Sequence, residues 1–280
     1  MALIEKAKSL VHPRNTLNDL PTVDWLKATR SWFMMRPKGR GSKISHPASF
    51  PEELVANYIQ FFTKKNALVL DTFLGSGTTT LVARQLQRNA VGIELNKKYA
   101  ELSQERLNEF PENNTKQLVI NDDSRNLKKI FKKQGIPQID FCITSPPYWN
   151  QLKNKGLKNT VDRSKSRKKL NLDVDYGSNS KDIGMIDEYD SFLDAQDEIF
   201  DKVYDLMKPR GYLLVVTNNV YKGGRMWPLA FDTVTRLSKK WVPKDEQIWC
   251  QDSRRLHPFG MFHSYIGNRA HHYCLIFRKE

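Results

Sequence analysis

Cysteine is scarce in this chain, and long apolar runs are absent from it. The three cysteines among 280 residues form no CxxC pair, so the sequence carries neither a disulfide framework nor a cysteine-based metal motif. No apolar run approaches the length of a membrane span, and the first residues hold no apolar block long enough for a signal peptide. We therefore expect no membrane association and a soluble protein of a reducing compartment, the cytoplasm of a prokaryote.

Acidic residues are also few relative to basic ones. Lys and Arg number 45 against 31 Asp and Glu, which gives a net charge of +14, and this balance favours a polyanionic partner. The six histidines show no ligand spacing with Cys, Asp or Glu, so we expect no metal. The length suits one α/β domain with insertions. We expect residues 1–45 to form a basic arm, for which a solvated linker is the alternative, and residues 46–280 to form the main domain.

The chain is organised around a short apolar run, residues 139–144, that ends in Ser145, Pro146, Pro147 and Tyr148. Its length and β-branched content predict a buried parallel strand. Because the prolines cannot donate ladder hydrogen bonds, the chain must leave the sheet there in a stiff turn. The carboxyl ends of such strands are where open α/β sheets bind ligands. An ordinary loop or a polyproline ligand is the alternative interpretation of this turn.

A glycine-containing loop, residues 71–77, follows a second predicted strand and precedes a helix. Gly75 and Gly77 permit close approach of a ligand, and Ser76 or Thr78 can cap the helix. A P-loop requires Lys where Thr78 stands, and the dinucleotide fingerprint requires a third glycine, so the loop suits a ligand without phosphate. Glu94 ends the next predicted strand, at the spacing where doubly wound folds place an acid on ribose hydroxyls. A helix-terminal acid is the alternative role for Glu94.

The two stretches, residues 67–80 and 139–149, together resemble the S-adenosylmethionine-dependent DNA amino-methyltransferases, which modify cytosine N4 or adenine N6. The first matches the family's Asp-x-Phe-x-Gly-Ser-Gly-Thr-Thr loop and the second its Ser/Asp-Pro-Pro-aromatic motif. Alternating predicted strands and helices indicate a doubly wound, mostly parallel sheet. The resemblance implies that this is a class I, Rossmann-like methyltransferase with seven strands, the seventh antiparallel. It also implies a small target-recognition insertion. The cofactor loop comes first here, whereas many relatives with Ser-Pro-Pro-Tyr have the opposite order.

The resemblance implies the residues that hold the cofactor. Asp71 would face its amino acid portion, Glu94 its ribose and Asp123 its adenine amino group, although Asp122 could replace Asp123 and both could be helix caps. The implied cofactor-binding residues are Phe50, Pro51, Asp71, Phe73, Gly75, Ser76, Gly77, Thr78, Glu94 and Asp123.

The implied catalytic residues are Ser145, Pro146, Pro147 and Tyr148. Ser145 Oγ and the Pro146 carbonyl would accept hydrogen bonds from the target amine, while Tyr148, with Trp149, would stack on a flipped base. Methylation of cytosine C5 would need a nucleophilic cysteine, and Cys142 lies inside the predicted strand. Family members with Ser at the first motif position mostly methylate cytosine N4. Adenine N6 methylation is one alternative, an RNA amine methyltransferase another, and a nucleic-acid-binding module without catalysis a third.

Two segments are candidates for target recognition on double-stranded DNA, residues 149–183 and 251–269. Basic residues crowd the first, and basic and aromatic residues alternate in the second, a composition that suits phosphate contact and base stacking. A solvated surface is the alternative for the first segment. A cognate restriction endonuclease would be a functional partner. The candidate DNA-binding residues are Lys153, Lys155, Lys158, Arg163, Lys165, Arg167, Lys168, Lys169, Arg254, Arg255 and Arg269.

Overall fold

The computed structural model describes residues 10–35, 51–149, 181–252 and 256–280. Its main sheet has eight strands in the order β1-β9-β10-β6-β5-β2-β3-β4, and β7 and β8 form a separate hairpin. The strands are β1 (Trp32–Met34), β2 (Leu68–Asp71), β3 (Asn89–Glu94), β4 (Gln117–Asn121), β5 (Ile139–Thr144), β6 (Met207–Thr217), β7 (Val220–Lys222), β8 (Arg225–Trp227), β9 (Val242–Cys250) and β10 (His271–Arg278).

The pairing is mostly parallel. Strands β4, β3, β2, β5 and β6 are parallel to one another, and β1 is parallel to β9. The last strand, β10, is antiparallel to both β6 and β9. The prediction of a mostly parallel sheet with an antiparallel seventh strand is therefore confirmed for the strands that the sequence indicates.

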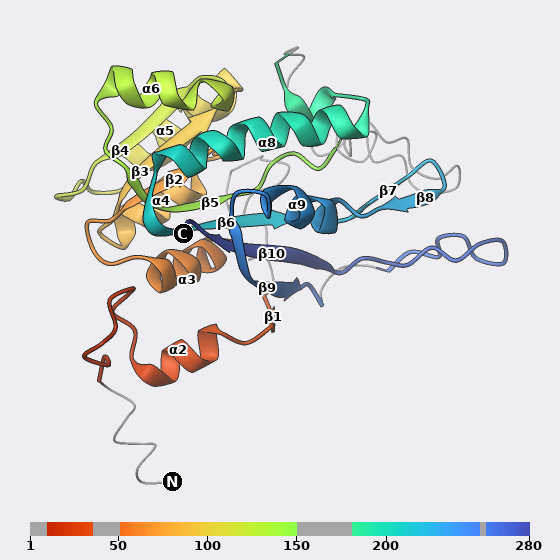
Figure 1. Ribbon diagram of the computed structural model, residues 1–280, viewed down its shortest axis with the longest axis horizontal. Helices are drawn as coiled ribbons and strands as arrows, with labels where there is room; N and C mark the ends of the chain where they lie inside the picture. Colours follow the sequence, from red (N-terminus) through yellow and green to blue (C-terminus); the bar gives the residue numbers. More distant parts are fainter. Residues whose placement is uncertain (1–9, 36–50, 150–180, 253–255) are drawn as a thin grey trace, which may run out of the picture.

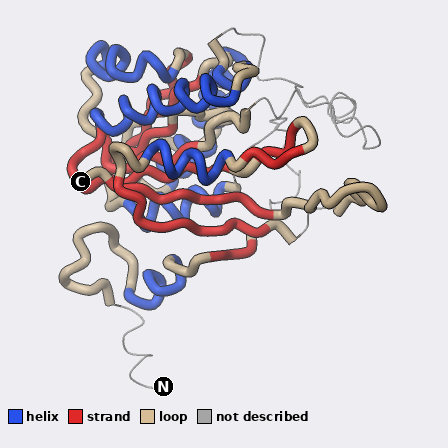
Figure 2. Tube along the Cα trace, turned by 45° about the vertical axis from the view of Figure 1, so that its right-hand side comes forward, coloured by secondary structure: helices blue, strands red, loops and turns tan. Residues whose placement is uncertain are grey.

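Helices cover both faces of the main sheet (Figures 1 and 2). On one face α3 and α4 pack against side chains such as Val69 and Phe141, and on the other α6, α8 and α9 pack against Leu70 and Cys142. Successive strand residues thus serve opposite layers, as the two-residue period of a strand requires. This is the doubly wound arrangement. The helices are α2 (Thr22–Ala28), α3 (Glu52–Phe62), α4 (Thr78–Gln85), α5 (Lys97–Asn108), α6 (Leu127–Gln134), α8 (Tyr189–Leu206) and α9 (Leu229–Leu237), with short 3₁₀ turns η2 (Ser124–Asn126) and η3 (Ile183–Met185).

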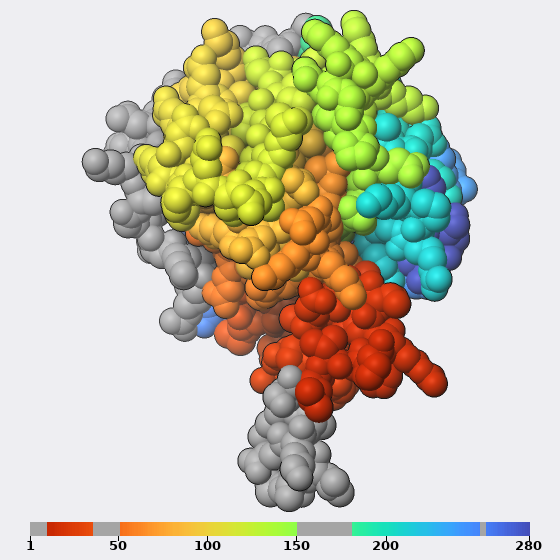
Figure 3. Space-filling view, turned by 90° about the vertical axis from the view of Figure 1, so that its left-hand side faces the viewer, coloured from red at the N-terminus to blue at the C-terminus, as the bar shows by residue number. Residues whose placement is uncertain are grey.

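The sheet has one strand more than the seven expected, because β1 comes from the residues expected to form a basic arm. Gln247 Nε2 donates to the carbonyls of Ala28 and Arg30 at 2.7 Å each, and Ile248 N donates to the Ser31 carbonyl at 2.9 Å. The buried Asn18 donates to the Phe61 carbonyl of α3 at 2.6 Å. In Figure 3 the described amino-terminal residues, in red, lie against the body of the molecule. A three-residue strand is too short to leave a periodic signal in the sequence.

Strand β6 contains residues 209–211, a Pro-Arg-Gly segment of a composition that usually interrupts a strand. The strand begins at Met207 and continues through this segment, with Arg210 at φ 65° and a register shift against β5 between Ile139 and Phe141. Arg210 N donates to the Lys279 carbonyl at 2.9 Å. A bulge therefore absorbs the proline, which a regular ladder would not tolerate.

Cys142, Cys250 and Cys274 lie in β5, β9 and β10, and none is in a disulfide. Cys142 is completely buried in β5, and its burial raises the pKa of the thiol well above the usual value. A thiol that stays protonated inside the sheet cannot act as a nucleophile. Within the described residues, no helix is both long and apolar enough to cross a membrane.

Two hairpins extend beyond the carboxyl edge of the sheet, on the side where β5 and β6 end (Figures 1 and 2). One is the β7–β8 hairpin, and the other contains the described residues 256–270 between β9 and β10. The second exposes large apolar side chains. They are Leu256, Met261, Phe262 and Tyr265, with exposed fractions of 69%, 56%, 91% and 96%.

Candidate active site

The turn after β5 presents a hydroxyl at the carboxyl edge of the sheet. Ser145 Oγ donates to the Val216 carbonyl of the neighbouring strand β6 at 3.0 Å. A serine hydroxyl has one proton to donate. Because Ser145 donates it to the Val216 carbonyl, the lone pairs of Oγ stay available to accept from an incoming amine. Pro146 is buried, and Pro147 lies so close to Gly184 of η3 that a Cβ there would be 2.8 Å from the proline Cβ. The turn is therefore held on both sides.

Tyr148 and Trp149 lie in different surroundings although they are adjacent. Tyr148 is partly exposed, and its hydroxyl is 3.4 Å from Ser145 Oγ. Trp149 is only 3% exposed, and its ring packs edge-on against Tyr189 at 4.8 Å and Trp227 at 4.7 Å between centroids. The expected stacking of a target base on Trp149 does not fit this burial. The ring belongs to the core, and Tyr148 alone faces the acceptor side.

Asp71 joins the glycine loop to the strand that carries Ser145. Its carboxylate accepts from Thr144 Oγ1 at 2.8 Å, Thr79 Oγ1 at 2.6 Å and Phe73 N at 3.0 Å. The residue is 2% exposed, and burial raises the pKa of its carboxyl while these hydrogen bonds act in the opposite direction. These contacts bring the predicted cofactor loop to within one residue of Ser145.

Each glycine of the loop has a left-handed backbone, with φ 57° at Gly75 and 83° at Gly77. A Cβ at Gly77 would lie 2.8 Å from the Ser103 Cβ, so this glycine allows helix α5 to approach the loop. Ser103 Oγ also donates to the Gly75 carbonyl at 2.8 Å. The amino-terminal cap of α4 is Gly77, without a side-chain hydrogen bond. The predicted capping by Ser76 or Thr78 was therefore wrong.

Ser76 and Thr78 instead surround Arg106, a residue that the sequence analysis missed. The Arg106 guanidinium donates to the Ser76 carbonyl, lies 3.5 Å from Thr78 Oγ1 and pairs with Glu52 of α3 at 3.2 Å. It is 8% exposed. Arg106 lies on the same side of α5 as the buried Tyr99, seven residues earlier, and a cation on an apolar helix face is the signal that could have identified it. It fixes the loop against two helices.

Glu94 lies at the end of β3 with its carboxylate against the glycine loop. One oxygen accepts from Gly75 N at 2.7 Å and the other from Asn96 N at 2.8 Å. Burial raises the pKa of Glu94 to about 7, the two hydrogen bonds oppose the shift, and the negative charge of Asp71 adds to it. Asn96 is the side-chain cap of α5, through its bond from Lys98 N at 3.0 Å. Glu94 is thus not required as that helix's cap.

Asp122 and Asp123 follow β4 on the same edge and differ in their partners. Asp123 caps the 3₁₀ turn η2 and forms a two-pronged pair with the Arg125 guanidinium, whose shortest distance is 2.7 Å. That pair holds the pKa of Asp123 below its usual value, although burial acts the other way. Asp122 accepts from Asp123 N at 2.7 Å and from Asn126 Nδ2 at 2.8 Å through the same oxygen. The capping alternative therefore applies to Asp123.

The other predicted cofactor residues are only partly described. Phe50 lies outside the described residues, and Pro51 stands at the amino end of α3. Phe73 is half-buried and packs on the cluster of apolar side chains beneath α8. Pro51, at the start of α3, and Phe73, in the glycine loop, therefore lie near the carboxyl edge of the sheet.

Most candidate DNA-binding residues lie outside the described part of the chain, namely Lys153, Lys155, Lys158, Arg163, Lys165, Arg167, Lys168, Lys169, Arg254 and Arg255. Arg269 is described and half-buried. Its guanidinium donates to the Asn219 carbonyl at 2.9 Å, and burial lowers its pKa. Arg269 therefore braces the base of the exposed hairpin against the loop after β6.

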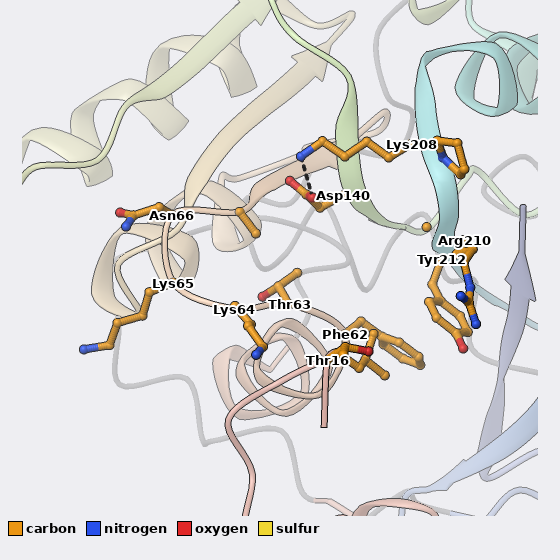
Figure 4. Close-up of a pocket in the computed structure, with 14 residues that line it drawn as sticks. Thr16, Phe62, Thr63, Lys64, Lys65, Asn66, Asp140, Lys208, Arg210 and Tyr212 are labelled. Atoms are coloured by element: carbon orange, nitrogen blue, oxygen red, sulfur yellow. Dashed lines mark hydrogen bonds and ion pairs between the residues drawn. The ribbon is translucent and has the colours of Figure 1, made fainter. Parts of the chain in front are cut away.

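A cavity of about 420 Å³ lies at the opposite edge of the sheet, where β5 and β6 begin. Figure 4 shows Lys208 in an ion pair with Asp140 at 2.7 Å, with Lys64, Lys65 and Arg210 around the opening. None of the residues predicted for the cofactor or for catalysis lines it. The predicted site is instead assembled from strand ends at the carboxyl edge.

Comparison with known proteins places this architecture in a family. A family model described as DNA methylase matches residues 11–105 and 139–280. The type II methyltransferase M.HinfI from Haemophilus influenzae is 41% identical over 78 residues, 28% of this chain and 22% of that protein. M.BglII from Bacillus subtilis is 30% identical over 117 residues, 42% of this chain and 30% of that protein. Each match thus spans less than a third of the relative's own length.

Among solved structures, TrmN from Thermus thermophilus superposes with a TM-score of 0.50 at 14% identity, covering 82% of this chain and 48% of that one. A likeness at this identity concerns the fold alone. The family match extends through the glycine loop, the Ser-Pro-Pro-Tyr turn and the antiparallel last strand. The chain belongs to the N6/N4 DNA methylase family.

Proposed function

We propose that this protein transfers a methyl group from S-adenosylmethionine to N4 of a cytosine flipped out of double-stranded DNA, at a specific sequence and as the modifying enzyme of a restriction-modification system. The observation that carries the proposal is the placement of Ser145. Its hydroxyl donates a hydrogen bond to the Val216 carbonyl. The preceding residue, Thr144, donates a hydrogen bond to Asp71 at the start of the proposed cofactor loop. An acceptor of hydrogen bonds thus lies beside the proposed methyl donor site.

The acceptor groups would compensate for the weak nucleophilicity of the target base amine. The lone pair of an exocyclic amine is delocalised into the base, and it becomes nucleophilic when the N–H groups are drawn out of the ring plane. Ser145 Oγ and the Pro146 carbonyl would accept those N–H groups and later the lost proton. Tyr148 would stack on the flipped base and offset an unstacking cost of a few kcal/mol. No protein nucleophile is needed, in keeping with the buried Cys142.

The residues at the carboxyl edge fit S-adenosylmethionine, which the DNA methylase family uses. When bound, it supplies a methyl group activated by a sulfonium. Glu94 would accept from the ribose hydroxyls through lone pairs that its two backbone donors leave available. Both hydrogen bonds of Asp122 are accepted by the same carboxylate oxygen. We propose that its other oxygen accepts from the adenine amino group, together with Asp123. The buried charge of Asp71, together with Phe50 and Pro51, would favour the cationic methionine end.

The two hairpins at this edge support a duplex as the substrate. The hairpin between β9 and β10 exposes Phe262 and Tyr265 almost fully, and it extends beyond the edge where β5 and β6 end (Figure 1). Aromatic side chains at such a position can stack on bases or enter a groove. The basic residues between 153 and 169 follow the acceptor turn directly in the sequence and would contact phosphates.

Nucleoside analysis tests the product. DNA incubated with the protein and labelled S-adenosylmethionine should yield label in N4-methylcytosine, because Ser145 stands where the family's adenine enzymes mostly have Asp. An RNA of the same sequence serves as the control and should stay unlabelled. Label in N6-methyladenine would refute the cytosine assignment but keep the acceptor chemistry. Label in RNA alone, or none in DNA, would refute the proposed function.

Glu94 gives a prediction for pH. Hydrogen bonds from ribose hydroxyls favour the ionised carboxylate, whereas the free protein holds a proton on it up to about pH 7. Cofactor affinity should therefore rise with pH and level off above about 7, by at most tenfold per pH unit, and binding should release a proton. Titration calorimetry in buffers of different ionisation enthalpy measures both quantities.

Glu94→Gln is the matched variant, since it keeps the shape and removes the titration. It should bind the cofactor more weakly and without this pH dependence. The same raised pKa makes the folded state hold a proton more tightly than the unfolded chain. The wild type should therefore lose stability relative to Glu94→Gln as the pH rises from about 4.5 to about 7. A wild-type affinity that is flat across this range would contradict the assignment of Glu94.

A further inference from the structure

A histidine from the far end of the chain lies at the acceptor site. The Tyr148 hydroxyl is 3.1 Å from His272 Nδ1 on β10 and 3.4 Å from Ser145 Oγ. His272 is separated from Tyr148 by 124 residues in sequence and belongs to neither motif. Only the antiparallel insertion of β10 beside β6 brings it there.

The orientation of the His272 ring is fixed by the sheet. It stacks on Trp249 of the neighbouring strand β9, with ring centroids 4.9 Å apart and planes 26° apart, and the two residues are direct register partners. Trp249 is 5% exposed, and its indole N–H donates to the Met35 carbonyl at 3.0 Å. A rigid platform that extends to the amino-terminal strand β1 thus holds Nδ1 towards Tyr148.

Among the described residues, Ser145 Oγ and His272 Nδ1 both lie within reach of the Tyr148 hydroxyl proton. If it is donated to Ser145 Oγ, it occupies one of the two lone pairs with which that oxygen can accept from the target amine. If it is donated to His272 Nδ1, both lone pairs of Ser145 Oγ stay available to accept, because Ser145 donates its own proton to the Val216 carbonyl. Donation of the Tyr148 proton to Nδ1, across the shorter contact of 3.1 Å, requires a neutral imidazole with its proton on Nε2.

We propose that His272 is a positioning residue of the acceptor site: by accepting the Tyr148 hydroxyl proton at Nδ1, it keeps Ser145 free to accept from the target amine and fixes the Tyr148 ring on which the base stacks. The role rests on the proposed function. In this role, β10 contributes a side chain to the acceptor site, and β9 and β1 hold that side chain in place.

Two substitutions separate the hydrogen bond from the packing. His272→Phe keeps a ring on Trp249 but has no acceptor, and His272→Asn restores an acceptor close to the position of Nδ1. With kcat and the KM for DNA measured for each, His272→Phe should lower kcat about tenfold, the effect of one hydrogen bond, while leaving cofactor binding unchanged. His272→Asn should recover most of the loss. Wild-type kcat in His272→Phe would overturn the proposal, as would equal losses in both variants.

A double-mutant cycle tests the route through Tyr148. In a Tyr148→Phe background, His272→Phe should have no further effect on kcat, since the hydroxyl that it orients is gone. A further loss as large as that in the wild type would overturn the proposal.

A second readout does not depend on turnover. In protein labelled with ¹⁵N-histidine, the resonances that disappear in His272→Phe identify the ring of His272. Their chemical shifts should report a proton on Nε2 in the wild type. In Tyr148→Phe the shifts should no longer report this tautomer. A proton on Nδ1 in the wild type would overturn the inference even if methyl transfer is demonstrated. The expected tautomer in a protein that transfers no methyl group would instead locate the failure in the proposed function.

Discussion

Ser145→Ala should lower kcat for methyl transfer about a hundredfold or more while leaving cofactor affinity unchanged. Removing Oγ deprives the target amine of an acceptor that acts on the reacting atoms, and groups of this kind contribute 10²–10⁴ in rate, to order of magnitude. The hydroxyl contacts the Val216 carbonyl and lies near Tyr148, and both lie on the acceptor side of the site. Single-turnover transfer to a DNA carrying the target sequence measures the loss, and calorimetry with S-adenosylmethionine measures the affinity.

Ser238→Ala is the matched control. The Ser238 hydroxyl also donates to a backbone carbonyl, that of Val234 at 2.6 Å, but it does so at the exposed carboxyl-terminal cap of α9. This variant should keep full activity. A Ser145→Ala protein that transfers methyl at the wild-type rate would remove the residue on which the catalytic proposal rests, whereas weakened cofactor binding in it would show that Ser145 serves the donor side.

Asp71→Ala should lower the free energy of unfolding by about 3–5 kcal/mol. The substitution leaves three donors, on Thr144, Thr79 and Phe73, without the carboxylate that accepts from them in the interior. Each buried group left unsatisfied costs about 1–3 kcal/mol, and rotation of the two threonine hydroxyls recovers part of the sum. Denaturant unfolding measures the change.

Asp71→Asn should cost less than Asp71→Ala, since the amide oxygen still accepts and the threonine hydroxyls can turn to accept from the amide nitrogen. A surface carboxylate provides the second control. Asp205 pairs with Lys128 and Lys240 at the protein surface, so Asp205→Ala should cost about 1 kcal/mol or less. If Asp71→Ala were no more costly than Asp205→Ala, Asp71 would not be the connection between the loop and β5 that its contacts indicate.

These expectations place different demands on the two motifs. In the proposed function the Ser-Pro-Pro-Tyr turn carries the chemistry, and Ser145→Ala should leave the fold intact. The glycine loop is also a structural joint, where Asp71 and Arg106 tie it to β5, α3 and α5. A loss of activity in a loop variant therefore has to be separated from a loss of folded protein before it is assigned to the cofactor.

Sequence reasoning located the elements of the site because their signals are local. The apolar run of β5 and its two prolines predict a strand that ends at Ser145, and the structure has this strand over the predicted residues. The spacing of Glu94 from the glycine loop predicts an acid for the ribose hydroxyls, which stays a prediction, and in the structure Glu94 accepts from Gly75 N of that loop at 2.7 Å. Alternating strands and helices also predict the doubly wound class.

The tertiary structure alone decided the contacts between segments far apart in the chain. Trp149 turns into the core beneath Tyr189, and β1 adds an eighth strand through Gln247 and Trp249. His272 reaches Tyr148 only because β10 runs antiparallel beside β6. Periodicity and motif spacing report which face of its own element a residue occupies, whereas these contacts depend on strand order and register, which are set by packing of the whole chain.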